Sequence, residues 1–221
     1  MKLDELPDDV LFYITEYFEI GNELNAILNH HKFFRNIARI HKKYLIYCSG
    51  KKSLKYYDML YENIAKDEWF YKIIQFKLRL WIYNCDCIRD VSKLGNVHTL
   101  GLPGCRNIRD VSALGNVHTL VLAGCQNITD VSALGKVHTL NLYDCRNITD
   151  VSALGNVHIL DLSYCQNIRD VSALGNVHIL DLSYCQNIRD VSALGNVHTL
   201  YLSQCRNITD TSMLKNTKIY R

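Results

Sequence analysis

Hydrophobic and polar positions recur along most of this chain with a fixed period of twenty residues. From Val91 to Asp210 one sequence unit is repeated six times, and the copies Val157–Asn176 and Val177–Asn196 are identical. Such a short and regular period is typical of stacked structural units that each contact only their neighbours. The pattern therefore predicts a solenoid.

Each unit combines a strand pattern with a short turn of helix. Val97, Leu100 and Leu102 are separated by more polar positions, as in a short strand with one buried face, so consecutive copies are expected to pair as a parallel sheet. Asp110 suits the N-cap of a single helical turn, expected to be 3₁₀, and Gly115–Asn116 suits a left-handed cap that ends it. Seven side chains per unit are expected to point inward and share a core with their equivalents: Val97, Leu100, Leu102, Cys105, Ile108, Val111 and Leu114.

The stack is expected to extend beyond the six copies at both ends. The segment Lys77–Asn96 keeps the register and predicts a degenerate seventh unit, so that seven strands are expected in all. After Asp210 the pattern erodes, as in a polar terminal cap or a frayed end, and Thr217–Tyr220 is an incomplete further strand.

The unit resembles the leucine-rich repeat. The segment 97–108 reads V-H-T-L-G-L-P-G-C-R-N-I and matches the pattern L-x-x-L-x-L-x-x-N/C-x-L, and its longer tail resembles the cysteine-containing subtype. The resemblance implies an α/β solenoid, a right-handed superhelix with a parallel sheet and short 3₁₀ or helical turns on the outside. The solenoid is assigned to residues 77–221.

The beginning of the chain has a helical pattern instead. Leu6 and Pro7 open an expected helix, and two further amphipathic stretches follow, which predicts a small all-α module over residues 1–45. Apolar residues at helical spacing continue through residues 46–76. This segment is expected to be a helical linker that caps the first repeat.

The order L-P-x-x-V-L-x-x-I-x-x-Y-F, which starts at Leu6, resembles the F-box. In that family the module binds the small adaptor subunit of SCF-type ubiquitin ligases, and through it the cullin, while repeats behind it hold the substrate. The segment Asn29–Phe34 departs from the family pattern. The resemblance implies these adaptor-facing and core positions: Leu6, Pro7, Val10, Leu11 and Ile14. The near-identical copies are also similar to repeat proteins of amoeba-infecting giant viruses.

Composition narrows the class of partner. The formal net charge is +3, so no strong field is available to attract nucleic acid or a membrane surface, and no stretch is apolar enough for a membrane span. Seven of the nine cysteines recur once per unit, which favours buried structural thiols over disulfides; a metal or redox ladder is the alternative. We expect a location in the cytoplasm or nucleus, or in the host cytoplasm if the protein is viral.

The repeated Ser, His and Asp positions belong to the repeat pattern itself, so neither a catalytic site nor a cofactor or metal is expected. The histidines, one per unit from His98 to His198, are expected to form an exposed row at one edge of the sheet. Positions that vary between copies fall on the outward strand face and just after it, where substitution is expected to cost little. They predict a target-binding surface on one concave sheet: Tyr143, Asp144, Asp161, Tyr164, Asp181, Tyr184 and Tyr201.

The leading hypothesis is a substrate receptor of an SCF-type ligase, in which the helical module binds the adaptor and the repeats bind an unknown protein target. The alternative is a stand-alone leucine-rich-repeat scaffold whose helical beginning is only a cap.

Overall fold

The computed structural model describes residues 44–49, 78–84 and 88–221. The chain divides into two compact units, Met1–Tyr44 and Leu45–Arg221, and the described repeats lie in the second. The helical module and most of the helical linker expected from the sequence lie outside the described residues. Where the two were expected to meet, the structure has a strand, Tyr44–Ser49.

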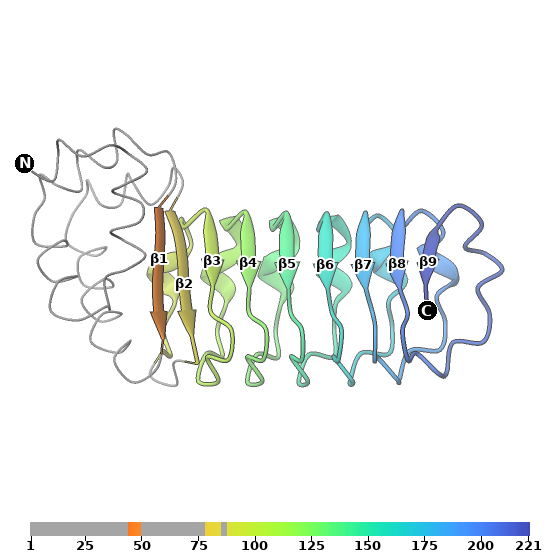
Figure 1. Ribbon diagram of the computed structural model, residues 1–221, viewed down its shortest axis with the longest axis horizontal. Helices are drawn as coiled ribbons and strands as arrows, with labels where there is room; N and C mark the ends of the chain where they lie inside the picture. Colours follow the sequence, from red (N-terminus) through yellow and green to blue (C-terminus); the bar gives the residue numbers. More distant parts are fainter. Residues whose placement is uncertain (1–43, 50–77, 85–87) are drawn as a thin grey trace, which may run out of the picture. The chain divides into compact units, whose positions relative to one another are not determined.

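The described repeats form one sheet of nine strands that follow chain order (Figure 1). The strands are β1 (Tyr44–Ser49), β2 (Leu78–Tyr83), β3 (Thr99–Gly101), β4 (Thr119–Val121), β5 (Thr139–Asn141), β6 (Ile159–Asp161), β7 (Ile179–Asp181), β8 (Thr199–Tyr201) and β9 (Lys218–Tyr220). From β2 onward every neighbouring pair is parallel. The register advances by one repeat per strand, so that Leu100 pairs with Leu120 and Leu120 with Leu140. The parallel sheet expected from the period is confirmed.

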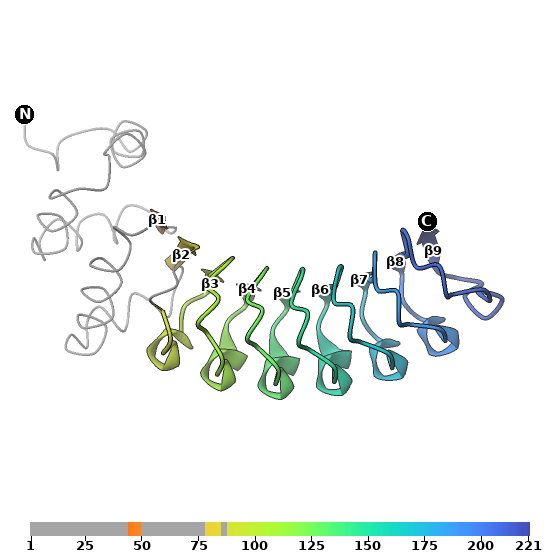
Figure 2. The same ribbon diagram turned by 90° about the horizontal axis from the view of Figure 1, so that it is seen from below.

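Six successive repeats carry a short 3₁₀ helix on the side opposite the sheet (Figure 2). These helices are η2 (Ser92–Leu94), η3 (Ser112–Asn116), η4 (Ser132–Lys136), η5 (Ser152–Asn156), η6 (Ser172–Leu174) and η7 (Ser192–Leu194). In η3 the Leu114 N–H donates to the carbonyl of Val111 at 2.9 Å. The N-cap residue is Val111, one position later than expected. Asp110 acts from outside the helix, because its carboxylate accepts the Ser112 N–H at 2.9 Å.

The glycine at the end of each 3₁₀ helix has a different role from the expected left-handed cap. Gly175 has a φ of −60°, which is ordinary right-handed backbone. Gly115 is not among the glycines with positive φ either. A Cβ at Gly115 would overlap the carbonyl oxygen of Ala133 in the next repeat. Glycine is therefore needed here because neighbouring 3₁₀ helices pack closely, and the expectation of a left-handed cap was wrong.

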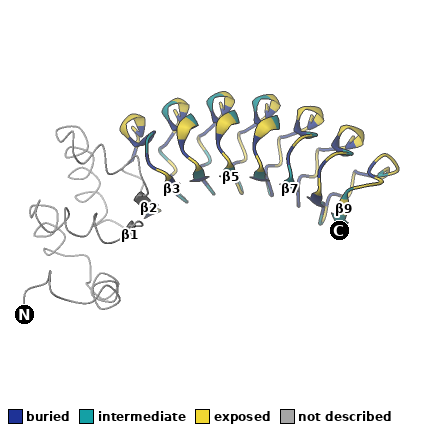
Figure 3. Cartoon of the chain, turned by 90° about the horizontal axis from the view of Figure 1, so that it is seen from above, coloured by how far each residue is buried: buried dark blue, intermediate teal, exposed yellow. Residues whose placement is uncertain are grey.

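The core lies between the sheet and the 3₁₀ helices and runs through all the described repeats (Figure 3). All seven inward positions of the sequence unit are buried, and none of them is more than 2% exposed in the first full copy. The equivalents remain buried as far as Ile208, at 5% exposure. The prediction of a shared, continuous core is confirmed for the described repeats.

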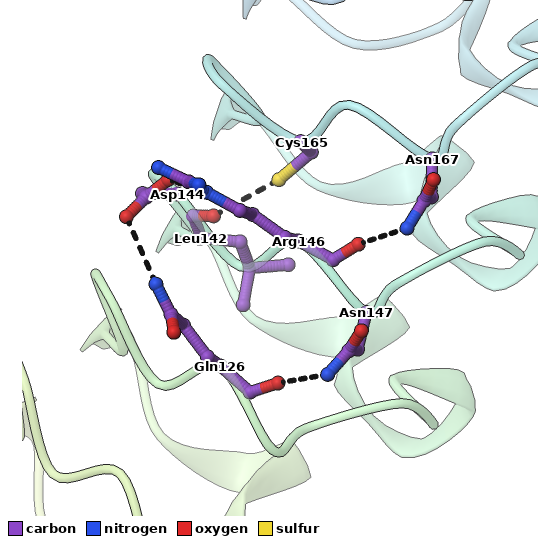
Figure 4. Close-up of polar contacts among 7 residues, drawn as sticks. All are labelled: Gln126, Leu142, Asp144, Arg146, Asn147, Cys165 and Asn167. Carbon is purple, nitrogen blue, oxygen red and sulfur yellow. Dashed lines mark hydrogen bonds and ion pairs between the residues drawn. The ribbon is translucent and has the colours of Figure 1, made fainter.

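Two polar contacts join neighbouring repeats, as the close-up of residues from three successive repeats shows (Figure 4). The Cys165 S–H donates to the carbonyl of Leu142 at 3.1 Å. The Asn167 side-chain N–H donates to the carbonyl of Arg146 at 2.7 Å. Equivalent contacts recur at the other described copies, which confirms the buried, weakly donating thiol expected from the sequence.

The sheet continues at both ends beyond the six regular copies. In the degenerate repeat, β2 carries the buried Ile82, and Ile88 and Leu94 are also buried. At the other end β9 pairs with β8, so the eroded segment adds a strand to the sheet. With β1 included, the sheet has two strands more than the seven that the period predicted.

The described repeats curve into an arc (Figure 2). The strands line its inner side, and the 3₁₀ helices lie on the outer side. The outward face of the sheet is therefore the concave surface of the repeats.

Candidate functional site

The concave surface is built from columns of side chains that the strand register places side by side. One column takes the last residue of each three-residue strand together with Trp81 of β2, and its members pair in register. In chain order it contains Trp81, Gly101, Val121, Asn141, Asp161, Asp181, Tyr201 and Tyr220. The column is aromatic at both ends and polar in the middle.

The aromatic residues at the two ends pack against their neighbours in the column, although Tyr220 remains exposed. The Trp81 ring lies over Gly101, because a Cβ at that glycine would overlap the ring. At the other end the rings of Tyr201 and Tyr220 stack with centroids 4.8 Å apart, and the Lys218 ammonium lies 5.1 Å from the Tyr220 centroid. These aromatic groups therefore flank a polar centre.

In the polar centre the aspartate side chains accept hydrogen bonds from the backbone of the turn that follows each strand. The Asp161 carboxylate accepts the Ser163 backbone N–H at 2.9 Å and the Asn141 side-chain N–H at 2.7 Å. Asp181 accepts the Ser183 N–H at 2.8 Å. Desolvation raises the pKa of Asp161 despite these hydrogen bonds, and the negative charge of Asp181 acts in the same direction.

The seven predicted target-binding residues do not all lie on the sheet itself. The structure places Asp161, Asp181 and Tyr201 on strands. The other four lie in the turns that follow the strands: Tyr143, Asp144, Tyr164 and Tyr184. The concave sheet expected to carry all seven is therefore a sheet face plus a ridge of turns at its edge.

Backbone geometry at this ridge is unusual. Tyr164 and Tyr184 have φ angles of 62° and 63°, in the left-handed region that disfavours residues with a Cβ. The equivalent position holds residues that tolerate this region better in four other repeats, Asn84, Gly104, Gly124 and Asp144, whereas Gln204 in the last copy also has a φ of 60°. The left-handed backbone is thus a constraint on residue type at this position that the sequence pattern did not indicate.

The tyrosines of the ridge contact one another. The rings of Tyr164 and Tyr184 are stacked with centroids 4.2 Å apart, and Tyr143 leans on Tyr164 at 5.2 Å. Hydrogen bonding to Tyr184 raises the pKa of the Tyr164 phenol. Because the ring faces cover one another, the ridge presents mainly ring edges and hydroxyl groups.

Asp144 is already paired. Its carboxylate lies 2.6 Å from the Arg146 guanidinium and also accepts the Gln126 side-chain N–H at 3.3 Å (Figure 4). The pairing with Asp144 raises the pKa of Arg146. Of the predicted carboxylates, Asp144 is therefore the one whose charge is compensated within the described chain.

A second column, two residues earlier on the same face, was missed as part of the site. Most of its members are threonines, but the identical repeats place Ile159 and Ile179 there, both half-buried. The replacement of Thr by Ile in these copies was the available sequence signal. It puts an apolar pair beside Asp161 and Asp181 on the concave surface.

The expected histidine row is present at the N-terminal ends of the strands, where each histidine directly precedes a strand. From His98 to His198 the six rings form a column with neighbouring centroids 4.6 to 4.8 Å apart. Desolvation, and then the neighbours His198 and His158, lower the pKa of His178. The row lies at the opposite end of the strands from the tyrosine ridge.

The thiols are poorly suited to redox or metal chemistry. Burial raises the pKa of Cys125 to about 12. Within residues 44–49, 78–84 and 88–221, no group of three or more His, Cys, Asp or Glu side chains converges as a metal site. Nor does that part of the chain contain a helix with the length and apolar character of a membrane span.

Comparison with known proteins relates this chain to solved structures only. No protein-family model matches the sequence, and no curated protein matches it significantly. An internalin (InlF) from Listeria monocytogenes superposes with a TM-score of 0.55 at 22% identity, over 73% of this chain and 53% of the internalin chain. This likeness shows the fold, a leucine-rich-repeat solenoid, and the chain spans about half the length of the structure it matches.

Two other structures match less well. The functional domain of InlJ from Listeria monocytogenes, which includes a cysteine ladder, has a TM-score of 0.29 at 17% identity, over 70% of this chain and 54% of that one. A leucine-rich-repeat protein from Leptospira interrogans has a TM-score of 0.29 at 14% identity, over 70% and 56%. The predicted adaptor-facing residues, from Leu6 to Ile14, lie outside the described residues.

Proposed function

We propose that this chain is a protein-binding scaffold whose concave surface holds a protein target. The observation that carries the proposal is the ridge formed by Tyr164 and Tyr184. Both residues occupy left-handed backbone, where Gly, Asn or Asp would be favoured, and strain of this kind persists mainly where function requires the side chain. Tyrosine contributes a large contact area at low entropic cost, so a ridge of stacked rings suits a protein interface.

The rest of the repeat supports this assignment. Core positions, glycines and the asparagine and cysteine contacts recur in copy after copy, whereas the concave positions differ. A scaffold of this type acts through shape and contacts, and its function requires no catalytic group.

The test uses the intact chain as bait for its target. Replacing Tyr164 and Tyr184 together with Ala should weaken target capture by about 2 kcal/mol or more, because clustered interface tyrosines are frequent hot spots. The matched control replaces the exposed Ser152 and Ser172 on the outer side of the arc with Ala. Equal capture by the two double variants would move the site away from the ridge, and no specific capture by the wild type would contradict the scaffold function.

We further propose that residues 1–45 attach the scaffold to an SCF-type ligase in the cytoplasm or nucleus. The support is the F-box-like order that begins at Leu6 and Pro7, placed before repeats as in the family it resembles. In this role the module binds the adaptor, and through it the cullin, while the repeats bring a target close to the site of ubiquitin transfer.

A direct binding assay with purified adaptor tests this role. The double variant Leu6→Ala with Pro7→Ala should lose adaptor binding while the circular dichroism and target capture of the repeats stay unchanged, because separate compact units lose function separately. If the wild-type chain itself does not bind the adaptor, the stand-alone scaffold is the remaining function.

A further inference from the structure

The two identical repeats differ from the other copies on their concave face in three ways at once. Ile replaces the usual Thr at the first strand residue, Asp occupies the last strand residue, and Tyr occupies the left-handed turn position. Because the copies are adjacent, each group occurs twice, side by side. We call this set the double-repeat patch: Ile159, Asp161, Tyr164, Ile179, Asp181 and Tyr184.

The geometry of the patch alternates apolar and acidic groups. Ile159 pairs with Ile179 and Asp161 with Asp181 across strands that are spaced about 4.8 Å apart. Along each strand the Ile and the Asp share one face at a separation of about 6.6 Å, two residues of extended chain. An apolar strip therefore lies next to a pair of carboxylates.

The two carboxylates lack a compensating cation in the described chain. The one ion pair found between described residues joins Arg146 to Asp144. Asp161 and Asp181 face each other in register with like charge. The chain as a whole is slightly basic, with a formal net charge of +3, so the negative potential here is local.

We propose that the double-repeat patch binds a lysine- or arginine-bearing segment of the target. The aliphatic stem of the basic side chain packs on Ile159 and Ile179, and its cation lies between the carboxylates of Asp161 and Asp181. Long basic side chains bury their stems on apolar surface in this way while the charged head remains solvated or paired. The inference rests on the proposed scaffold function and adds the chemistry of the partner.

A peptide series measures the two halves of this recognition separately. Short fluorescent peptides of one extended sequence carry lysine, arginine, norleucine, glutamate or 2,4-diaminobutyrate at alternate positions. Fluorescence anisotropy with the full chain should give the tightest binding for lysine and arginine. Norleucine keeps the stem without the charge, and diaminobutyrate keeps the charge on a stem two methylene groups shorter than that of lysine, so both should bind at least about tenfold more weakly.

Two double variants provide the matched comparison. Asp161→Asn with Asp181→Asn removes the two charges but keeps a side-chain oxygen to accept the Ser163 and Ser183 N–H groups. The control is Asp150→Asn with Asp170→Asn on the outer side, which changes the net charge equally. Those aspartates also accept the N–H two residues on, each at 2.9 Å, and also lie in adjacent repeats.

The concave double variant should lose at least about tenfold in lysine-peptide affinity, whereas the outer double variant should keep wild-type affinity. Equal affinities of the two variants, or lysine binding no better than norleucine and glutamate, would overturn the proposal. If the tyrosine double variant loses the target while the concave aspartate variant keeps it, the scaffold function holds and the basic partner is wrong. If the wild type captures no target, the scaffold function itself fails.

Discussion

At the residue scale, glycine serves two separate purposes in this repeat. Gly124 has a φ of 71° and its nearest neighbours lie 3.7 Å from a Cβ added there, so backbone conformation alone favours glycine. Gly135 has no such φ, but a Cβ there would overlap the Ala153 carbonyl oxygen of the next repeat. The second kind of glycine sets how closely the 3₁₀ helices stack.

We expect Gly135→Ala to lower the free energy of unfolding by about 1–3 kcal/mol, as overpacking of a tight contact usually does. Gly195→Ala is the matched control, because it occupies the same position in a later repeat but leaves 3.1 Å between the new Cβ and the Met213 oxygen. It should change stability by less than about 1 kcal/mol. Urea unfolding followed by circular dichroism gives both values, and an equal loss would show that stacking distance is not the cause.

The residues that sequence could place are those governed by period and polarity. Burial of Val97, Cys105 and their equivalents follows from the spacing alone, because each repeat must hide the same face. The left-handed backbone at Tyr164 could not be predicted from the residue type, because tyrosine does not favour that conformation. Comparison with Gly104 and Gly124 at the same repeat position was the missed signal.

At the element scale, the stacking of the histidine column affects the protonation of His178. The pKa of His178 is lowered by desolvation and then by its neighbours His198 and His158. A histidine whose folded pKa lies below its unfolded value of about 6.5 binds fewer protons in the folded state. Its stabilising effect is therefore complete above the unfolded pKa and is lost as the pH falls below it.

We expect the urea midpoint of the repeats to fall between about pH 7.5 and about pH 5, because protonation of His178 is less favourable in the folded state than in the unfolded state. Two triple variants isolate the contribution of adjacent rings. Both keep three of the six histidines in the column, and His178 is one of them. The alternating variant replaces His118, His158 and His198 with Gln and leaves no neighbouring rings.

The contiguous variant replaces His98, His118 and His138 with Gln and leaves three adjacent rings. The alternating variant should be the less sensitive to acid, since its remaining charges lie further apart. The same acid sensitivity in both would exclude repulsion along the column as the cause.

At the scale of the whole molecule, repetition explains what could be predicted. A twenty-residue period fixes the order, direction and register of strands β3 to β8, because every copy must pair with the next in the same way. The period does not reach β1, so its membership of the sheet was not evident. The incomplete strand expected at Thr217–Tyr220 is β9, although the period is eroded there. The position of the target site is also less predictable, because it depends on the few positions at which the residue differs between copies.

The two identical copies allow a test of this modular organisation. Deleting Val177–Asn196 joins Asn176 to Val197 and restores the original sequence across the junction. The variant should fold cooperatively with a sheet shorter by one strand, about 4.8 Å. It should be less stable than the wild type, because one interface between neighbouring repeats is lost. Deleting only Val177–Gln186 should unfold the stack, since half a unit cannot continue the register.

Target binding is expected to differ between this deletion and the deletion of a repeat elsewhere in the stack. Removing Val117–Lys136 also takes out one whole unit, but it leaves the double-repeat patch intact. It should therefore retain more target binding than the deletion of Val177–Asn196, which removes Ile179, Asp181 and Tyr184. Calorimetry shows first whether both variants fold, and the capture assay then compares them. If both fold and lose the target equally, recognition depends on the length or curvature of the whole sheet, and the double-repeat patch is not the site that distinguishes this chain.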